Sequence, residues 1–233
     1  TAGVARDSAS NVSSVSSGQA TTRSAQAQFL TSSEVSSSLQ GAELANAEKV
    51  LMALGLQDIA DNYEPLSAAE VKISLQKAIA DVRAQQSPQV AGFNRNNYNP
   101  AVLHLRYLSS EEAASSVGDQ VTLELILITA EAESKGLRVV LNKQDFARSL
   151  RGLYGALSTQ QPVHSDDPTS PARWLYQQLF GAIEPTLRDR AVTTLLLSAD
   201  QGLQAIPYGA LHDGNQFLGE RFGLALTPSL TLT

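Results

Sequence analysis

The segment Val121–Thr129, with the sequence VTLELILIT, constrains the fold of this chain more than any other. It is apolar at nearly every position, so both of its faces need cover from other parts of the protein. It has the length of a strand and is far shorter than the roughly 20 apolar residues that a membrane-spanning helix needs. We therefore expect the central strand of a sheet and no membrane span.

Strand patterns also occur elsewhere in the chain, in the segments 101–107, 137–141, 191–198 and 222–226. The first of them alternates, with Leu103, Leu105 and Tyr107 on one side, which predicts a half-buried strand. His104 lies opposite that apolar face. We expect it to be a surface histidine or one satisfied by hydrogen bonds, rather than a ligand. The last segment, 222–226, predicts a short edge strand.

Helical patterns alternate with these strands. Their predicted starts are Gly41, the capping box formed by Ser67 and Glu70, the cap Asn142, and the pair Ser170-Pro171. The first two helices are predicted to form an antiparallel pair. The helix that follows Ser170 is expected to end before Pro185, because the residue before a proline disfavours helical geometry.

Strands separated by helices predict an α/β sheet with helices packed on it. The early strands are close enough in sequence to pair antiparallel, whereas the strand after the Pro171 helix needs a crossover and should be parallel to a neighbour. Residues 1–40 are rich in Ser, Thr, Ala and Gln, which predicts a low-complexity, flexible segment. Residues 41–99 are predicted to be a helical lead-in and linker, and residues 100–233 the sheet domain.

Composition narrows the possible functions. The net charge is -6, Lys and Arg form no dense patch, and a single Trp and six Phe leave little for base stacking, so we expect no nucleic-acid partner. The absence of Cys excludes a disulfide, a thiolate metal site and a cysteine nucleophile supplied by this chain. Gly152, Gly155 and Gly181 are isolated and fit no nucleotide-binding motif, so no cofactor is expected.

Three groups of residues invite a chemical interpretation, and each has a simpler one. His212-Asp213 resembles an acid–base pair, but Asp213-Gly214 is typical of a tight turn in which His212 bonds locally. Ser198, Asp200 and His212 contain the residue types of a serine triad, yet no Gly-x-Ser-x-Gly elbow surrounds Ser198. The segment 164–167 (His-Ser-Asp-Asp) lacks the spacing of known metal motifs. We therefore predict no catalytic and no metal-binding residue.

The last third of the chain resembles the CHAT domain. The segment 195–214 (LLLSADQGLQAIPYGALHDG) is similar to the family signature, and the segments 217–222 (FLGERF) and 227–230 (TPSL) continue it. Weaker similarity extends back through the segments 170–185 and 47–59. The residues of the family motif, which we expect to be structural, are Asp200, Leu203, Pro207, Ala210, Leu211, His212, Asp213, Gly214, Pro228 and Ser229.

The resemblance implies a caspase-like fold, with a mostly parallel sheet flanked by helices, in the peptidase clan of caspases and separases. In that family a His and a Cys further along the chain perform cysteine acyl transfer. This sequence ends before that region and contains no Cys, so neither residue can be assigned here. We expect the non-catalytic N-terminal half of a CHAT domain, preceded by a helical hairpin and a Ser/Thr-rich flexible segment. Its partner would be the missing C-terminal half of the same domain.

Three functional classes stay open. The chain is part of a cysteine peptidase, a nonenzymatic scaffold that contacts TPR-like helical repeats, or a secreted, surface-associated protein. The bacterial cytoplasm is the expected compartment, with secretion as the alternative. The chain starts at Thr1 and no signal peptide is visible, so we expect a processed or trimmed polypeptide. Without its later strands, the sheet should expose an apolar edge and self-associate.

Overall fold

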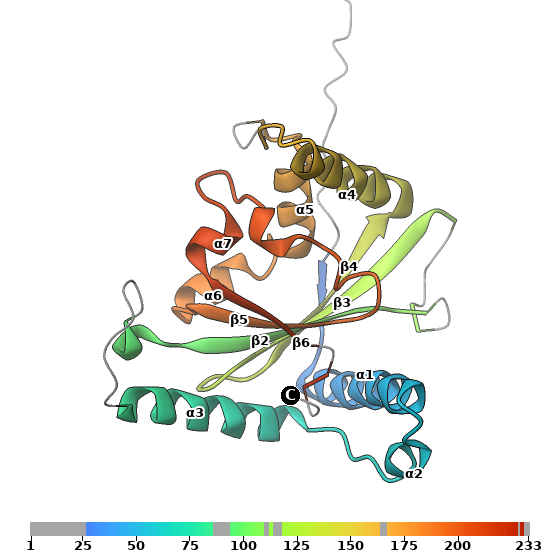
Figure 1. Ribbon diagram of the computed structural model, residues 1–233, viewed down its shortest axis with the longest axis vertical. Helices are drawn as coiled ribbons and strands as arrows, with labels where there is room; N and C mark the ends of the chain where they lie inside the picture. Colours follow the sequence, from blue (N-terminus) through green and yellow to red (C-terminus); the bar gives the residue numbers. More distant parts are fainter. Residues whose placement is uncertain are drawn as a thin grey trace, which may run out of the picture.

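The computed structural model describes residues 27–85, 94–109, 112–113, 118–163, 167–227 and 229–230. These residues form a six-stranded sheet with helices on both faces (Figure 1). The strands lie in the order β1-β4-β3-β2-β5-β6. Their bounds are β1 Ala27–Phe29, β2 Pro100–Tyr107, β3 Gln120–Thr129, β4 Lys135–Asn142, β5 Thr194–Ala199 and β6 Gly223–Thr227.

The sheet is mixed. Strands β2, β3 and β4 pair antiparallel in sequence order, and β1 adds antiparallel to β4. On the other side β5 runs parallel to β2, and β6 runs parallel to β5. The predicted α/β class is confirmed, whereas "mostly parallel" is only partly right. The reason is the kind of connection: no helix occurs among the described residues between β2 and β3 or between β3 and β4, and the first helical connection after them leads to β5.

One face of the sheet carries the larger core. It is covered by α4 Lys143–Ser158, α5 Pro171–Leu179, α6 Glu184–Asp189, α7 Leu218–Arg221 and the 3-10 turn η2 Tyr208–Ala210. Phe146, Leu175 and Phe180 pack there against Leu125 and Leu197 of the strands. Asn142 caps α4 with its side chain, as predicted.

The opposite face is covered by the N-terminal helices, α1 Ser32–Ala53, α2 Gln57–Ala60 and α3 Ala68–Ala84. Val35 of α1 and Val71 of α3 pack on Val102, Ile126 and Ile128 of the sheet. The predicted lead-in is therefore a layer of the sheet domain. This layer also buries the second face of β2, so the prediction of a half-buried strand there was wrong. The prediction of β3 as a central strand is confirmed.

Several element ends differ from the predictions. Helix α1 begins at Ser32 instead of Gly41, because Thr31 and Glu34 form a capping box that starts the helix earlier. Its first turns and β1 therefore occupy part of the segment 1–40 that was predicted to be flexible, while residues 1–26 lie outside the described residues. The capping box of Ser67 and α3 is confirmed.

The predicted limits of α5 are confirmed, because it spans Pro171–Leu179 and ends before Pro185, but the causes differ from those predicted. Helix α5 begins at Pro171, but Ser170 makes no side-chain capping bond, and its buried Oγ has no partner among the described residues. Pro185 does not end a long helix. It lies in the first turn of the separate helix α6, where its missing amide costs nothing.

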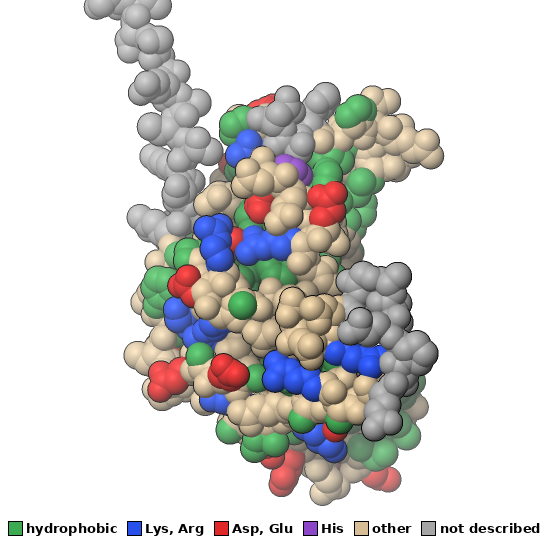
Figure 2. Space-filling model, turned by 90° about the vertical axis from the view of Figure 1, so that its left-hand side faces the viewer, with side chains coloured by type: hydrophobic (Ala, Val, Ile, Leu, Met, Phe, Trp, Pro, Cys, Tyr) green, Lys and Arg blue, Asp and Glu red, His purple; other side chains and the backbone are tan. Residues whose placement is uncertain are grey.

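Within the described ranges, no helix is long and apolar enough to cross a membrane. Of the predicted linker, residues 86–93 are outside the described ranges, and Arg95–Asn97 forms the short 3-10 helix η1. On the face shown in Figure 2, Lys and Arg side chains are scattered among acidic and uncharged ones.

Candidate functional site

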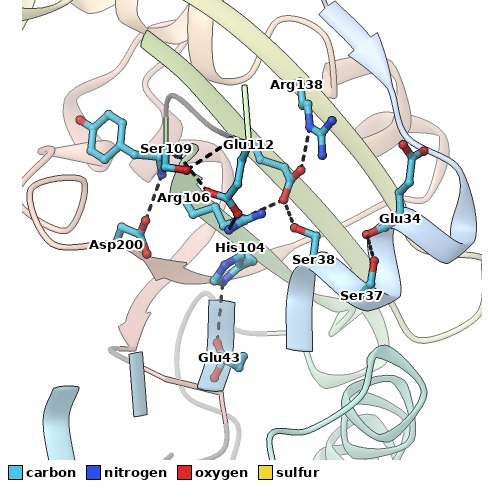
Figure 3. Close-up of polar contacts among 12 residues, drawn as sticks. Glu34, Ser37, Ser38, Glu43, His104, Arg106, Ser109, Glu112, Arg138 and Asp200 are labelled. Carbon is cyan, nitrogen blue, oxygen red and sulfur yellow. Dashed lines mark hydrogen bonds and ion pairs between the residues drawn. The ribbon is translucent and has the colours of Figure 1, made fainter. Parts of the chain in front are cut away.

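The carboxyl ends of the parallel strands β2 and β5 form the most polar part of the fold. From β2 the chain continues to β3 and β4 on one side, and it returns to β5 on the other side of β2. In open α/β sheets, the crevice at such a switch in strand order is where ligands commonly bind. Helix α1 lies across this region, so the polar side chains come from α1, β2, β4 and the segment after β5 (Figure 3).

Four fully buried polar side chains, Glu43, His104, Ser198 and Ser229, lie beneath α1; we call them the Glu43 cluster. The Glu43 carboxylate accepts hydrogen bonds from Ser198 Oγ at 3.2 Å, Ser229 Oγ at 2.9 Å and the amide of Leu230 at 2.8 Å. His104 Nδ1 lies 3.2 Å from Ser198 Oγ and 3.7 Å from Glu43 Oε1. One carboxylate on α1 therefore joins β2, β5 and the segment after β6.

His104 is neutral in this cluster. Burial lowers its pKa below the usual value, and this effect outweighs the nearby charges of Glu43 and Asp200, which act to raise it. Because Ser198 donates its only hydrogen to Glu43, the imidazole bonds to Ser198 through a hydrogen on Nδ1. Its Nε2 is buried and has no partner among the described residues. Of the two expected alternatives, the structure excludes a surface histidine, because His104 is buried, and it bears out a satisfied one only in part, through Nδ1.

The Glu43 cluster contains a serine, a histidine and a carboxylate, but their order does not fit nucleophilic catalysis. In a catalytic triad the imidazole takes the serine proton and the carboxylate orients the imidazole. Here Ser198 lies between the other two and donates to Glu43. All three side chains have no solvent exposure, so a substrate cannot reach the hydroxyl. The arrangement fits a structural role.

A second cluster surrounds Glu124, which is fully buried in β3. It accepts a hydrogen bond from Arg106 Nε at 2.9 Å and from Arg138 Nε at 3.0 Å, and also from Ser38 of α1. The two arginines face it directly across β2 and β4 in the strand register. Burial alone would lower the pKa of Arg106, but hydrogen bonds and charge from Glu124 and Glu112 raise it, so the guanidinium stays charged.

Above Glu124 lies a cavity of about 530 Å³, which we call the arginine pocket. Arg106 and Arg138 form its strand side, and the small side chains of α1, including Ala45, form the other (Figure 3). The remaining lining residues are Glu34, Ser37, Ser38, Gly41, Ala42, Asn46, Lys49, Tyr107, Glu112 and Asp200.

The described family-motif residues lie in four places, of which the turn at His212-Asp213-Gly214 is the last. Asp200 is at the arginine pocket, where its Oδ2 accepts the Tyr107 amide at 3.0 Å and Oδ1 accepts Asn46 Nδ2 at 3.3 Å. Leu203 and Leu211 are buried in the larger core, Ala210 packs against that core, and Pro207 precedes η2. Ser229 belongs to the Glu43 cluster, and Pro228 lies outside the described residues.

The His-Asp-Gly segment forms the expected turn. Gly214 has a φ of 110°, and its amide donates to His212 Nδ1 at 2.9 Å. Asp213 Oδ1 accepts the amides of Asn215 and Gln216, and these bonds, together with the charge of Arg221, lower its pKa against the opposing effect of burial. His212 packs edge-on against Phe217. Ser198, Asp200 and His212 therefore have separate partners and form no triad.

No group of three or more metal-ligating side chains occurs among the described residues. The segment 164–167 was considered as a metal site from its sequence. Residues 164–166 lie outside the described residues, so the structure describes only Asp167 of this segment.

Comparison with known families concerns one part of this architecture. Residues 169–233 match the CHAT domain family model. This confirms the resemblance over the segment from the start of α5 to the end of the chain, which we call the CHAT segment. It includes β5, η2, α7 and β6, whereas α1 to β4 lie outside it. No curated protein and no solved structure matches the chain.

The Glu43 cluster joins the CHAT segment to the preceding part of the chain, whereas the Glu124 cluster lies wholly within that preceding part. Sequence reasoning missed both. Ser198 and Ser229 of the segment meet Glu43 and His104 from outside it. Glu124 did carry a signal, because a charge inside an apolar strand needs buried partners. Glu43 carried none, since a glutamate in a helix is ordinarily a surface residue.

Proposed function

We propose that this chain is the non-catalytic N-terminal portion of a CHAT-type, caspase-like cysteine peptidase. Its role is architectural: it forms one part of the sheet and one wall of the substrate groove, while another portion of the protein supplies the reactive thiol and imidazole. Support comes from the match of the CHAT segment and from a sequence without Cys. The proposal depends on a site at which the remaining strands can add.

Strand β6 is that site, and it is the observation that carries the proposal. It is the last strand of the sheet next to β5, and its sequence GLALT has neither the charge nor the proline that usually protects an edge strand. Leu226 is 55% exposed. Strand β5 has a neighbour on each side, β2 and β6, so on this side of the sheet the edge of the described residues is β6.

The side chains beside this edge are also incompletely covered. Leu224 and Leu226 line a hollow of about 300 Å³ with Ile206, Pro207 and Tyr208, next to η2. The hollow is mostly apolar, and it continues the larger core at Leu197. A further strand on β6, with the segment leading to it, would cover these groups and pair with the outward-facing backbone amides and carbonyls of the edge.

Sedimentation velocity tests the edge. We expect the 233-residue chain to self-associate with increasing concentration and Leu226→Lys to stay monomeric, because a lysine at an edge opposes strand pairing. Leu157→Lys is the matched control, since Leu157 is exposed on α4 away from β6, and it should behave like the original chain. A monomeric original chain with a cooperative melt would argue against an unfilled edge.

The coding sequence beyond residue 233 tests the functional assignment itself. A strand ending in His-Gly, followed by a second strand ending in Ser-Ala-Cys, supports the peptidase. A stop codon contradicts the proposal of a partial domain and favours the nonenzymatic scaffold. A signal sequence upstream of residue 1 supports secretion instead of a location in the bacterial cytoplasm.

The nonenzymatic scaffold remains a second candidate because of one surface feature. At the corner between α1 and α2, the large apolar side chains Met52, Leu54, Leu56 and Ile59 are exposed close together in sequence. Exposed apolar groups of this kind are typical of protein-interaction sites. A helical-repeat partner of the TPR type would bind this corner, and Ile59→Lys would weaken that complex without changing the behaviour of β6.

A further inference from the structure

The arginine pocket has unused hydrogen-bond donors and almost no unused acceptors. Its acidic side chains are already engaged by protein donors. Beneath the pocket, Glu124 accepts from two arginines and Ser38; of the lining acids, Glu112 accepts from Arg106 and the Ser109 amide, and Asp200 accepts from Tyr107 and Asn46. Glu34, the third lining acid, accepts the amide and hydroxyl of Thr31 through Oε2 and keeps Oε1 without a hydrogen bond from the described residues.

The cationic side chains of the pocket, in contrast, have donor hydrogens that the described residues do not engage. Arg138 bonds to Glu124 through Nε alone, and its two terminal nitrogens form no hydrogen bond with the described residues, although the charge of Glu34 acts on this arginine. The ammonium of Lys49 likewise forms no hydrogen bond within the described part of the chain. Arg106 uses Nε and Nη1 and keeps Nη2. A guanidinium has five donor hydrogens and an ammonium has three, so several donors face the cavity without an acceptor.

Partial burial of the arginines and the open volume of the cavity favour binding of an anion by these donors. Arg138 is 28% exposed and Arg106 is 14% exposed, so their charges are screened less than those of freely exposed side chains. Small residues of α1, among them Ser37 and Ala45, form the opposite wall and leave the cavity open. Its volume of about 530 Å³ is within the range of small-molecule sites.

We propose that the arginine pocket binds a small molecule through a carboxylate or phosphate group, held by Arg138 and Lys49 at the carboxyl ends of β2 and β5. A planar guanidinium matches the two oxygens of such an anion. The bound molecule would bridge α1 and the sheet, and this binding is independent of whether β6 accepts a further strand.

Calorimetric titration of the 233-residue chain with inorganic phosphate and with citrate, at constant ionic strength set by sodium chloride, tests the proposal. We expect saturable binding of at least one anion and a matching rise in the melting temperature. Binding of phosphate alone would assign a phosphoryl ligand, and binding of citrate alone a carboxylate ligand. Binding of neither anion at millimolar concentration would overturn the proposal.

Variants separate the pocket from general charge effects. Arg138→Gln and Lys49→Gln should each weaken binding at least tenfold. Ala45→Met should do the same by filling the cavity, without altering any charge and with only a small loss of helix propensity. Arg148→Gln is the matched control, because Arg148 is exposed on α4 and pairs with Asp145 away from the pocket. Lys49→Gln and Ala45→Met keep the partners of Glu124, so unchanged affinity in both would overturn the site even if Arg138→Gln fails to fold.

Discussion

Replacing Glu43 with alanine removes the acceptor on which Ser198 Oγ, Ser229 Oγ and the Leu230 amide converge. The carboxylate and both hydroxyl side chains are fully buried, so water cannot replace the lost acceptor without a rearrangement of α1. A buried donor left without a partner costs about 1–3 kcal/mol. Relaxation, and the release of Glu43 from its own desolvation, offset part of that cost.

We therefore expect Glu43→Ala to lower the free energy of unfolding by about 3–5 kcal/mol, the summed cost of three buried donors without an acceptor after these offsets. For a chain of this size, each kcal/mol changes the melting temperature by about 2–4 °C, so the expected decrease is roughly 6–20 °C. Glu43→Gln keeps the shape and one acceptor oxygen, and it should cost about 1–2 kcal/mol.

Urea unfolding followed by circular dichroism measures these differences. Glu48→Ala is the matched control on the same helix, because Glu48 is exposed and should change stability by no more than about 0.5 kcal/mol. If Glu43→Ala and Glu48→Ala have the same stability, the buried carboxylate does not hold the layers together and the reasoning is refuted.

Three further predictions concern other buried or strained groups. Stability should fall as pH drops below about 6.5, because the imidazole of His104 takes up a proton in the unfolded state while burial lowers its pKa in the folded state. The free energy of unfolding, measured from pH 7.5 to 5.5, should depend less on pH in His104→Gln. Gly214→Ala should cost about 1–3 kcal/mol, since its φ is 110° and a Cβ would meet Arg173, whereas Gly155→Ala in an open helical position should stabilise by about 0.5–1 kcal/mol in the same melts. Glu124→Ala should cost about 3–5 kcal/mol and Glu112→Ala less than about 1 kcal/mol, and equal losses would contradict the assigned burial.

Local signals predicted the elements whose cause is local. The Ser67 capping box starts α3, Asn142 caps α4, and the apolar run of β3 lies at the centre of the sheet. The sequence also predicted the pairing directions: strands close together in the chain pair antiparallel, and β5, which follows the helical connection, runs parallel to β2.

Tertiary features were beyond the reach of such signals. Strand β1 spans only Ala27–Phe29 and carries no alternating pattern, so its conformation depends on pairing with β4. The layer formed by α1 and α3 reads in sequence as a separate hairpin, because a helical stripe does not say which surface it covers. The ladder of Arg106, Glu124 and Arg138 needs the register of β2, β3 and β4, which the sequence does not specify.

Hydrogen exchange of the β6 amides, residues 223–227, tests whether β6 receives a further strand of the same domain. The comparison is between the 233-residue chain and the product of the complete reading frame. We expect the outward-facing amides to exchange rapidly in the 233-residue chain. In the product of the complete reading frame, a further strand pairs with them and should slow their exchange at least tenfold. Equal protection in both would show that β6 receives no strand, and the proposed role in a CHAT peptidase would then be wrong.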